Sequence, residues 1–570
     1  MRSKFIFRTR VLSGVFIFLA LFLVVRLYFV QIVHGSGYQR DAEAQYVQKS
    51  WDTEGRSNIF FSTKEGDLIS AAIMQTGWRI AIKPKEIQDP QAIYKQLHEL
   101  TPIDSGRFFA SAAKKDDPYE DVAFRVSDAA ASKVRALALP GVLLVADQWR
   151  YYPAQELAAH VIGFVGYKGD TRTGVYGLER SWQESLAKIN NGRYTNPFAE
   201  IFLNIESAVT SDPASQKGSL VTSIEPHVQA ELEATLEGVM KTYTPNLLGG
   251  IIMDPHTGEI VAMGVRPAFD PNTYNTVEDV DVFSNPLVES IYEMGSIMKP
   301  LTMAAGIDMR VVTPKTTYND KGCIEKSGKR ICNFDGKARG VVSMQEVLNQ
   351  SLNTGVSYVV DKMGHEAFGR YVVGMQLGAR TGIDLPNEAK GQIESIMNGY
   401  DVDYTSASFG QGIAVSPIGM TRALASLANQ GVMPTPHIVK AIKYENGITR
   451  AIDVKEGLRV FSTSTVDTTT RMLVTVFDDA LLGGVLKQAH HSIAAKTGTA
   501  QIAMPGGRGY YENRFLHSFF GYFPAYDPKF IIFLFAVEPH GAEFASATLA
   551  RPFADIAKLL IDYYDIPPDR

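Results

Sequence analysis

The longest apolar run in the chain lies near its N-terminus. Residues 11–33 are almost wholly apolar, and as a helix they would span about 35 Å, enough to cross a bilayer. Four basic side chains within residues 1–10 predict that this tail stays in the cytoplasm and that the rest of the chain lies on the other side. Residues 42–44 (AEA) look like a signal-peptide cleavage site, but the apolar run exceeds a usual signal core, which favours an uncleaved single-pass anchor.

Beyond the anchor, residues 35–215 mix short alternating segments with short amphipathic ones. The alternation in residues 77–82 predicts a strand, and residues 88–100 predict a helix. Residues 205–218 are rich in Ser, Ala, Pro and Gly and indicate a domain boundary. We therefore expect an α+β domain over residues 35–215 and a second domain over residues 216–570.

The second domain has a more regular pattern. Amphipathic periodicity predicts a helix at each end, over residues 228–243 and 546–563. Apolar runs around the turn Pro255-His256-Thr257-Gly258 predict a hairpin within residues 249–263. A second hairpin is expected from residues 515–523 and 530–537, whose strands should join the same sheet as residues 492–503.

Composition narrows the class of protein. Hydrophobic residues make up 45% of the chain and charged residues 21%, which are values typical of globular proteins. A length of 570 residues is too great for one core and predicts more than one domain. A net charge of −5 provides no basic field, so no nucleic-acid partner is expected. Cys323 and Cys332 are the only cysteines, and the sequence leaves open whether they pair across a hairpin. No metal site is predicted, because His490 and His491 have no further ligand near them in the sequence.

The first candidate catalytic pair is Ser296 and Lys299, within the stretch YEMGSIMKP. A serine hydroxyl needs a neighbouring base to act as a nucleophile at neutral pH. Residues three apart share a helix face, so a helix that begins near Ser296 would place the Lys299 amine over the hydroxyl. Gly295 allows a sharp entry to that helix, and Pro300 is tolerated in its first turn. Taken alone, the pattern also fits an ordinary helix start with an exposed lysine.

A second candidate pair is Ser351 and Asn353. Residues 343–346 (SMQE) form a capping box, so a helix should begin there and end near Ser351, with another helix starting from Thr354. In the intervening turn, residues two apart can point the same way, which would direct the Ser351 hydroxyl and the Asn353 amide into a common cleft. A plain connector between two helices fits this segment equally well.

The third candidate segment is the predicted strand at residues 492–503, which contains Lys496, Thr497, Gly498 and Thr499. One cation and two hydroxyls on this strand suit a carboxylate ligand. A glycine inside a strand indicates close approach by another backbone. The free edge of such a strand can accept an extended peptide as an added strand.

In this order, the three segments reproduce the Ser-x-x-Lys, Ser-x-Asn and Lys-Thr-Gly motifs of penicillin-binding proteins and serine β-lactamases. Over nearly its whole length the chain resembles the class B penicillin-binding proteins, which are monofunctional peptidoglycan transpeptidases. Further similar segments are residues 26–28 (RLY), 150–153 (RYYP), 177–179 (GLE), 409–412 (FGQG) and 416–417 (SP). Two segments depart from the family pattern. Leu352 replaces an aspartate found in some members, and residues 55–59 (GRSNI) match an early motif poorly.

The resemblance implies an α+β multidomain protein of the inner membrane. Residues 1–10 would form a cytoplasmic tail and residues 11–33 a single transmembrane helix. Residues 35–215 would form an elongated α+β pedestal of the dimerisation type, and residues 216–570 a penicillin-binding transpeptidase domain. That domain would contain an antiparallel sheet flanked by helices, as in serine β-lactamases, and would lie in the periplasm.

The resemblance also implies a role for each motif residue, without any cofactor. Ser296 would attack the D-Ala–D-Ala carbonyl of a stem peptide, with Lys299 as base. Ser351 would pass a proton to the leaving amine, while Asn353 would hold a substrate amide and orient Lys299. Lys496 would add positive potential and help keep Lys299 neutral. The strand residues Thr497, Gly498 and Thr499 would bind substrate, with the Ser296 and Thr499 N–H groups as the oxyanion hole.

Several related functions share this set of motifs. A D,D-carboxypeptidase and a β-lactamase both use water to resolve the acyl-enzyme, and the anchor and pedestal argue against a secreted β-lactamase. A β-lactam sensor would need more than ten cytoplasmic residues, and a non-catalytic scaffold would not need all three motifs. Glu293 and the short C-terminus favour septal synthesis over an elongation-type role. Expected partners are stem peptides, β-lactam inhibitors, the membrane, and a polytopic glycan polymerase with other wall-synthesis proteins.

Overall fold

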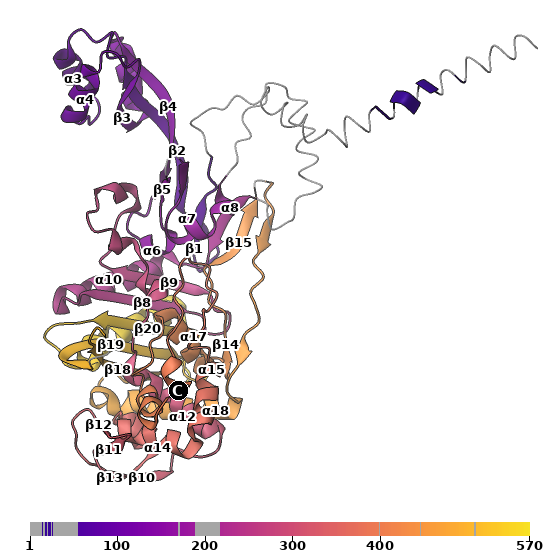
Figure 1. The fold of residues 1–570 in the computed structure, drawn as a ribbon, viewed down its shortest axis with the longest axis vertical. Helices are drawn as coiled ribbons and strands as arrows, with labels where there is room; N and C mark the ends of the chain where they lie inside the picture. Colours follow the sequence, from indigo (N-terminus) through magenta and orange to yellow (C-terminus); the bar gives the residue numbers. More distant parts are fainter. Residues whose placement is uncertain are drawn as a thin grey trace, which may run out of the picture. The chain divides into compact units, whose positions relative to one another are not determined.

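The computed structural model describes residues 55–168, 171–187, 217–397, 399–444, 446–506 and 509–570, with a few helical positions between 14 and 26 (Figure 1). Most of the predicted anchor at residues 11–33 therefore lies outside the described residues, as does most of the predicted boundary at residues 205–218. Among the positions that are described, none belongs to a helix with both the length and the apolar character needed to cross a bilayer.

The chain divides into two compact units. The smaller unit comprises Met1–Gly55, Thr76–Trp149 and Ala187–Gln216, and the larger unit comprises Arg56–Gln75, Arg150–Leu186 and Lys217–Arg570. Segments from the first third of the sequence thus belong to the same compact unit as the C-terminal residues.

In the smaller unit, helices pack on a small antiparallel sheet. Part of β2 (Leu68–Ile82) pairs with β3 (Glu120–Val126) and β4 (Val142–Tyr151), which confirms the strand predicted at residues 77–82. Between residues 76 and 149, which are all described, the helices are α3 (Pro90–His98), α4 (Ser105–Ala113) and α5 (Asp128–Leu137). Helix α3 begins where expected because Asp89 accepts a hydrogen bond from Ala92 N (3.0 Å) and Pro90 supplies a compatible first turn. Apolar side chains of all these elements form one core.

The larger unit contains a five-stranded antiparallel sheet. Its strands follow the order β18 (Ala494–Ala503), β19 (Tyr510–Phe523), β20 (Phe530–Val537), β8 (Leu247–Met253) and β9 (Ile260–Arg266). Both predicted hairpins are confirmed, and they belong to one sheet with the predicted strand at residues 492–503. Strand β18 lies at the edge, which leaves one side of its backbone free of sheet pairing.

Both faces of this sheet are covered. Along β20, Phe533 and Phe535 enter one core while Ile532 and Leu534 enter the other, as the alternation of a strand requires. The second core is closed by α10 (Pro226–Tyr243) and α20 (Ala550–Tyr563), the two amphipathic helices predicted at the ends of the domain. The first core includes α12 (Lys299–Asp308) and α14 (Asn353–Met363), which carry candidate site residues, and α18 (Thr463–Thr475), which carries none (Figure 1).

A buried ionic cluster joins three distant segments of the larger unit. Arg56 Nε and Arg150 Nε each donate to the carboxylate of Glu179, the latter at 2.6 Å, and all three side chains are buried. Tyr152 OH donates to the same carboxylate at 3.3 Å. One carboxylate shared by two guanidiniums leaves little freedom in how the segments fit together. The poorly matching segment at residues 55–59 and the family-like residues 150–153 and 177–179 therefore meet at one point.

Candidate active site

Ser296 lies where the chain turns sharply into a helix. It belongs to the 3-10 turn η5 (Gly295–Met298), which leads directly into α12 with Pro300 in the first turn. Gly295 has a φ of +64°, and a Cβ there would lie only 3.0 Å from Thr499 O. Gly295 N also donates to Gly410 O at 3.1 Å. The predicted sharp entry is confirmed, and glycine is required there by both conformation and close packing.

Ser351 lies in the turn between two helices, as predicted. The first, α13 (Met344–Asn349), begins at Ser343, whose hydroxyl accepts from Glu346 N at 3.3 Å. The second, α14, starts at Asn353, one residue earlier than expected. Ser351 itself has a φ of +56°, a left-handed conformation that is costly for a residue with a Cβ. Its surroundings must therefore hold this turn in place.

The segment Lys496 to Thr499 lies in the edge strand β18. Gly498 packs against the chain just before Ser296, since a Cβ on this glycine would lie 2.8 Å from Met294 O. The same carbonyl accepts a hydrogen bond from Ser518 Oγ of β19 at 2.9 Å. Close approach by another backbone, predicted from a glycine inside a strand, is confirmed, and it brings β18 beside Ser296.

Two lysines from different motifs meet at the Ser351 hydroxyl. Ser351 Oγ accepts from Lys299 Nζ at 3.1 Å and from Lys496 Nζ at 3.0 Å. Lys299 Nζ also donates to Ser351 O. Within the described residues, no hydrogen bond joins Lys299 Nζ to Ser296 Oγ, so the direct contact expected from helix spacing is not formed in this structure. The order of the three motifs along the sequence nevertheless predicted which elements come together.

The two lysines are in an unusual electrostatic environment. Both are buried, Lys299 completely, and no carboxylate within the described part of the chain forms an ion pair with either one. Burial lowers the pKa of Lys299 well below its usual value, and the nearby Lys496 lowers it further. Burial also lowers the pKa of Lys496, to about 7. A neutral Lys299 retains two N–H groups, enough for both Ser351 contacts, and one lone pair that can accept a proton.

Among the remaining predicted site residues, Thr497 contacts this centre, since its carbonyl accepts from Lys496 Nζ at 3.1 Å. Asn353 Nδ2 donates to Cys332 O at 2.8 Å, and within the described residues no hydrogen bond joins Asn353 to either lysine. Thr499 Oγ1 accepts from Ala545 N at 3.1 Å. Thr497 and Thr499 are partly exposed, as are Ser296 and Ser351, whereas the lysines are not. The four residues that carry these hydroxyls are therefore more accessible to solvent than the two lysines.

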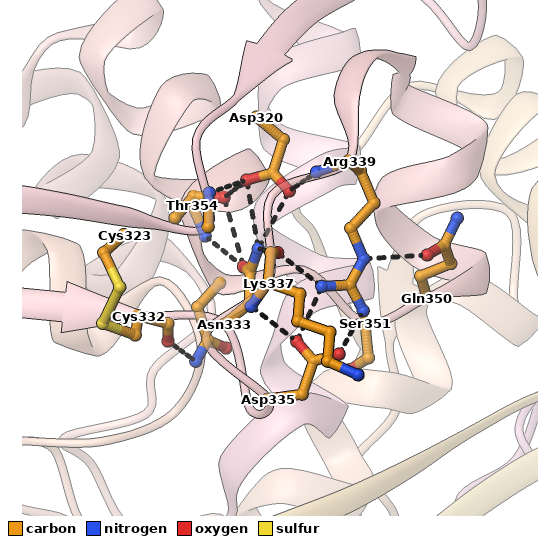
Figure 2. A network of polar contacts seen from close by, with 12 residues as sticks. Asp320, Cys323, Cys332, Asn333, Asp335, Lys337, Arg339, Gln350, Ser351 and Thr354 are labelled. Carbon is orange, nitrogen blue, oxygen red and sulfur yellow. Dashed lines mark hydrogen bonds and ion pairs between the residues drawn. A yellow bond between two sulfur atoms is a disulfide. The ribbon is translucent and has the colours of Figure 1, made fainter.

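The structure also resolves what the sequence left open about the cysteines. Cys323 and Cys332 are paired in a disulfide across the hairpin of β11 (Cys323–Lys326) and β12 (Lys329–Cys332) (Figure 2). Next to this hairpin, sequence reasoning missed a buried polar network formed by Asp320, Asn333 and Thr354, which lies directly beside the second motif. No sequence signal pointed to it, because its members come from three separate parts of the chain: Asp320 ends β10 (Thr317–Asp320), Asn333 follows β12, and Thr354 lies in the first turn of α14.

Comparisons with known proteins identify the family. A model of the penicillin-binding protein transpeptidase domain matches residues 248–558, and a model of the penicillin-binding protein dimerisation domain matches residues 61–197. The chain belongs to the penicillin-binding protein transpeptidase family. Its class B character, predicted above from the resemblance over nearly the whole chain, is confirmed by the match to both domain models and by the relatives described next.

Similar proteins extend over most of the chain. Stage V sporulation protein D of Bacillus subtilis is 26% identical over 552 residues, which cover 95% of this chain and 83% of that protein. Peptidoglycan D,D-transpeptidase FtsI of Escherichia coli is 24% identical over 573 residues, which cover 99% of this chain and 92% of that protein. Penicillin-binding protein 3 of Mycobacterium tuberculosis, solved in complex with aztreonam, has a TM-score of 0.67 at 21% identity and covers 91% of this chain and 98% of that one. This structural likeness supports the predicted α+β transpeptidase fold.

Proposed function

We propose that this chain is a serine-type peptidoglycan D,D-transpeptidase that cross-links stem peptides in septal wall synthesis. The observation that carries the proposal is the meeting of Lys299 and Lys496 at Ser351, beside the turn that presents Ser296. A buried lysine without a carboxylate partner is costly to keep in a fold, and use of its neutral amine as a base would account for that cost. The names of the FtsI relatives agree with this reaction and with a septal role.

Acylation would begin with attack of Ser296 Oγ on the carbonyl between the two terminal D-alanines. Neutral Lys299 would take the hydroxyl proton through its free lone pair as the new C–O bond forms. The two residues share no hydrogen bond in the structure, so one of the side chains would have to move to complete the contact. Such contacts in unliganded sites often tighten only when substrate binds.

Collapse of the tetrahedral intermediate would break the peptide bond and release D-alanine. Ser351 Oγ already accepts from both lysines, so its own proton is available for the leaving amine. The Lys299 ammonium would then return a proton to Ser351, which restores the starting state. Lys496, with its pKa held near 7, would favour the neutral form of Lys299 through repulsion and would attract the anionic peptide end.

Substrate would lie along the free edge of β18 as an added strand. Thr497 and Thr499 would hold its terminal carboxylate, with Gly498 allowing close approach between them. Asn353 would hold a substrate amide through its Oδ1, since Nδ2 is held by Cys332 O. The N–H groups of Ser296 and Thr499 would stabilise the developing oxyanion, an effect worth roughly 10²–10³ in rate per donor.

Release from the enzyme would need an amine from a second stem peptide, which attacks the ester and leaves a new peptide bond. A β-lactam would acylate Ser296 in the same way and remain attached. The aztreonam and ampicillin complexes of penicillin-binding protein 3 support this part of the proposal.

The reaction products separate transpeptidation from hydrolysis. The full chain in detergent would receive a stem pentapeptide ending in D-Ala-D-Ala and a fluorescent D-amino acid as acceptor. We expect one D-alanine released for each acceptor incorporated, because the site would favour an amine over water. Mostly tetrapeptide without incorporated acceptor would instead indicate a carboxypeptidase, and rapid turnover of a β-lactam would indicate a β-lactamase.

The apolar run at residues 11–33 would anchor the enzyme in the inner membrane, with its catalytic unit in the periplasm. Together with the pedestal it would bind a polytopic glycan polymerase, which supplies the strands to be cross-linked. Replacing residues 11–33 with an unrelated transmembrane helix should abolish co-purification with that polymerase. Unchanged co-purification would place the contact elsewhere.

A further inference from the structure

Helix α14, which follows the second motif, has no cap of its own. Its N-cap residue is Leu352, whose side chain cannot accept a hydrogen bond from the first turn. The N–H of Thr354 instead donates to Asn333 Oδ1 at 3.2 Å, from a residue 21 positions earlier. The cap of this helix therefore comes from a different loop, and the loop fixes where α14 starts.

Asn333 is itself held by a buried carboxylate. Its Nδ2 donates to both oxygens of Asp320, at 3.0 Å and 3.1 Å. Asp320 also accepts from Thr354 Oγ1 at 2.7 Å, from Gly322 N at 3.1 Å and from Arg339 N at 2.9 Å. Asp320, Asn333 and Thr354 are each at most 3% exposed. Within the described residues no cation forms an ion pair with Asp320, so neutral donors alone satisfy this carboxylate.

Figure 2 shows this network beside Ser351 and the disulfide. The residue before Asn333 is Cys332, whose carbonyl accepts from Asn353 Nδ2 at 2.8 Å. Adjacent residues of one loop thus hold the backbone of Thr354 and the side chain of Asn353. Tyr318 OH lies 3.1 Å from Thr354 Oγ1 and closes the network on its other side.

The network acts on the strained turn at Ser351. The left-handed backbone of Ser351 is followed within three residues by Thr354, whose N–H and hydroxyl are both held. Loosening of that anchor would let the turn relax and move Ser351 Oγ away from the two lysine amines. A displacement of about 1 Å in a catalytic group can cost about 100-fold in rate.

We propose that Asp320, acting through Asn333 and Thr354, is a positioning residue for acylation, which holds the Ser351–Asn353 segment against Lys299 and Lys496. This inference rests on the proposed function. Asp320 touches neither the reacting atoms nor either lysine in the hydrogen bonds and ion pairs of the described residues. Its effect is on the geometry of Ser351 and Asn353.

Asp320→Asn in the full chain tests the proposal. The variant keeps the shape of the side chain but replaces one acceptor oxygen by a donor, which would face donors already in place. Acylation by a chromogenic cephalosporin would be measured over a range of concentrations to separate the acylation rate constant from the binding constant. We expect the rate constant to fall about 10- to 100-fold while the binding constant changes less than about twofold.

Matched variants separate positioning from general loss of stability. Asp361→Asn removes a carboxylate that accepts from Lys326 of the same hairpin at 2.6 Å, but farther along α14, and should leave acylation unchanged. Thr354→Val should reproduce the effect of Asp320→Asn, and Thr354→Ser, which keeps the hydroxyl, should restore acylation. The Thr354 pair decides the question if Asp320→Asn fails to fold.

Three outcomes would overturn the proposal. They are a folded Asp320→Asn with the wild-type rate constant, equal loss in Thr354→Ser and Thr354→Val, or an effect confined to the melting temperature. If the proposed function is wrong, the wild-type chain itself will take no acyl group. That result differs from the three outcomes above, in which the wild type is acylated, and it would contradict the inference as well.

Discussion

Replacing Ser296 with alanine should abolish covalent labelling by a fluorescent penicillin, with a loss of at least about 10⁴-fold in acylation rate. The variant keeps the lysines, Ser351 and β18 but lacks the only atom proposed to form a bond to the acyl group. Labelling of the membrane-embedded protein, read on a denaturing gel, measures the effect. Ser290→Ala, six residues earlier in the same stretch, should label like the wild type.

Label that survives in Ser296→Ala would place the nucleophile elsewhere and contradict the assignment of the first motif. An absence of label on both the wild type and the variant would favour a scaffold role, or a site that opens only when a partner binds. Addition of the co-purified polymerase would separate these two explanations.

Lys299→Met should lower the acylation rate by about 10²–10⁴-fold, the range expected for loss of a general base. The methionine has a similar length and no amine, so Ser351 would keep its contact with Lys496 only. The rate of acylation by the chromogenic cephalosporin, measured as for Asp320→Asn, reports the effect. Lys558→Met, on the exposed side of α20, is the matched control and should leave the rate unchanged.

Lys299→Met should also raise the free energy of unfolding, by an amount that depends on pH. Burial lowers the pKa of Lys299 in the folded chain, so between that lowered pKa and the unfolded value of 10.5 the unfolded chain binds a proton that the folded chain does not. The wild type therefore gains stability as pH rises towards 10.5. The gain from methionine should shrink as pH rises through this window, as measured by urea unfolding. Wild-type and variant curves that stay parallel from pH 7 to 10.5 would contradict the buried neutral amine.

The contribution of Lys496 to stability changes with pH in the same direction as that of Lys299. Its pKa is about 7 in the folded chain and 10.5 unfolded, so its contribution to stability rises with pH within that window. On the proposed function, the two lysines therefore carry a cost in stability below pH 10.5 that catalysis would offset.

Much of the fold could be predicted because its elements carry local signals. The alternation along β20, the apolar faces of α10 and α20, and the capping serine at residue 343 each depend on neighbours within a few residues. The elements carrying the three motifs were predictable for the same reason. That these elements meet at Ser351 could be predicted only from the family resemblance, since no spacing along the sequence gives the distance between Lys299 and Lys496.

The details that depend on distant contacts could not be predicted. Helix spacing placed Lys299 over Ser296, but the amine turns to Ser351 because a left-handed turn brings both Ser351 oxygens within reach. The Asp320 network was missed because Asn333 and Thr354 lie 13 and 34 residues from Asp320, and no local pattern indicates that these segments meet. Arg56 appeared only as a departure from the family pattern, although it pairs with Glu179 in the larger unit.

The most direct test of the account is the mass of the acylated protein. The full chain would be incubated with benzylpenicillin, its intact mass measured, and the adduct located in proteolytic fragments. The account predicts one penicilloyl group per chain, attached to Ser296 and stable over the time of the experiment. An adduct on any other residue, or a wild-type chain that stays unmodified in the presence of its partners, would contradict it.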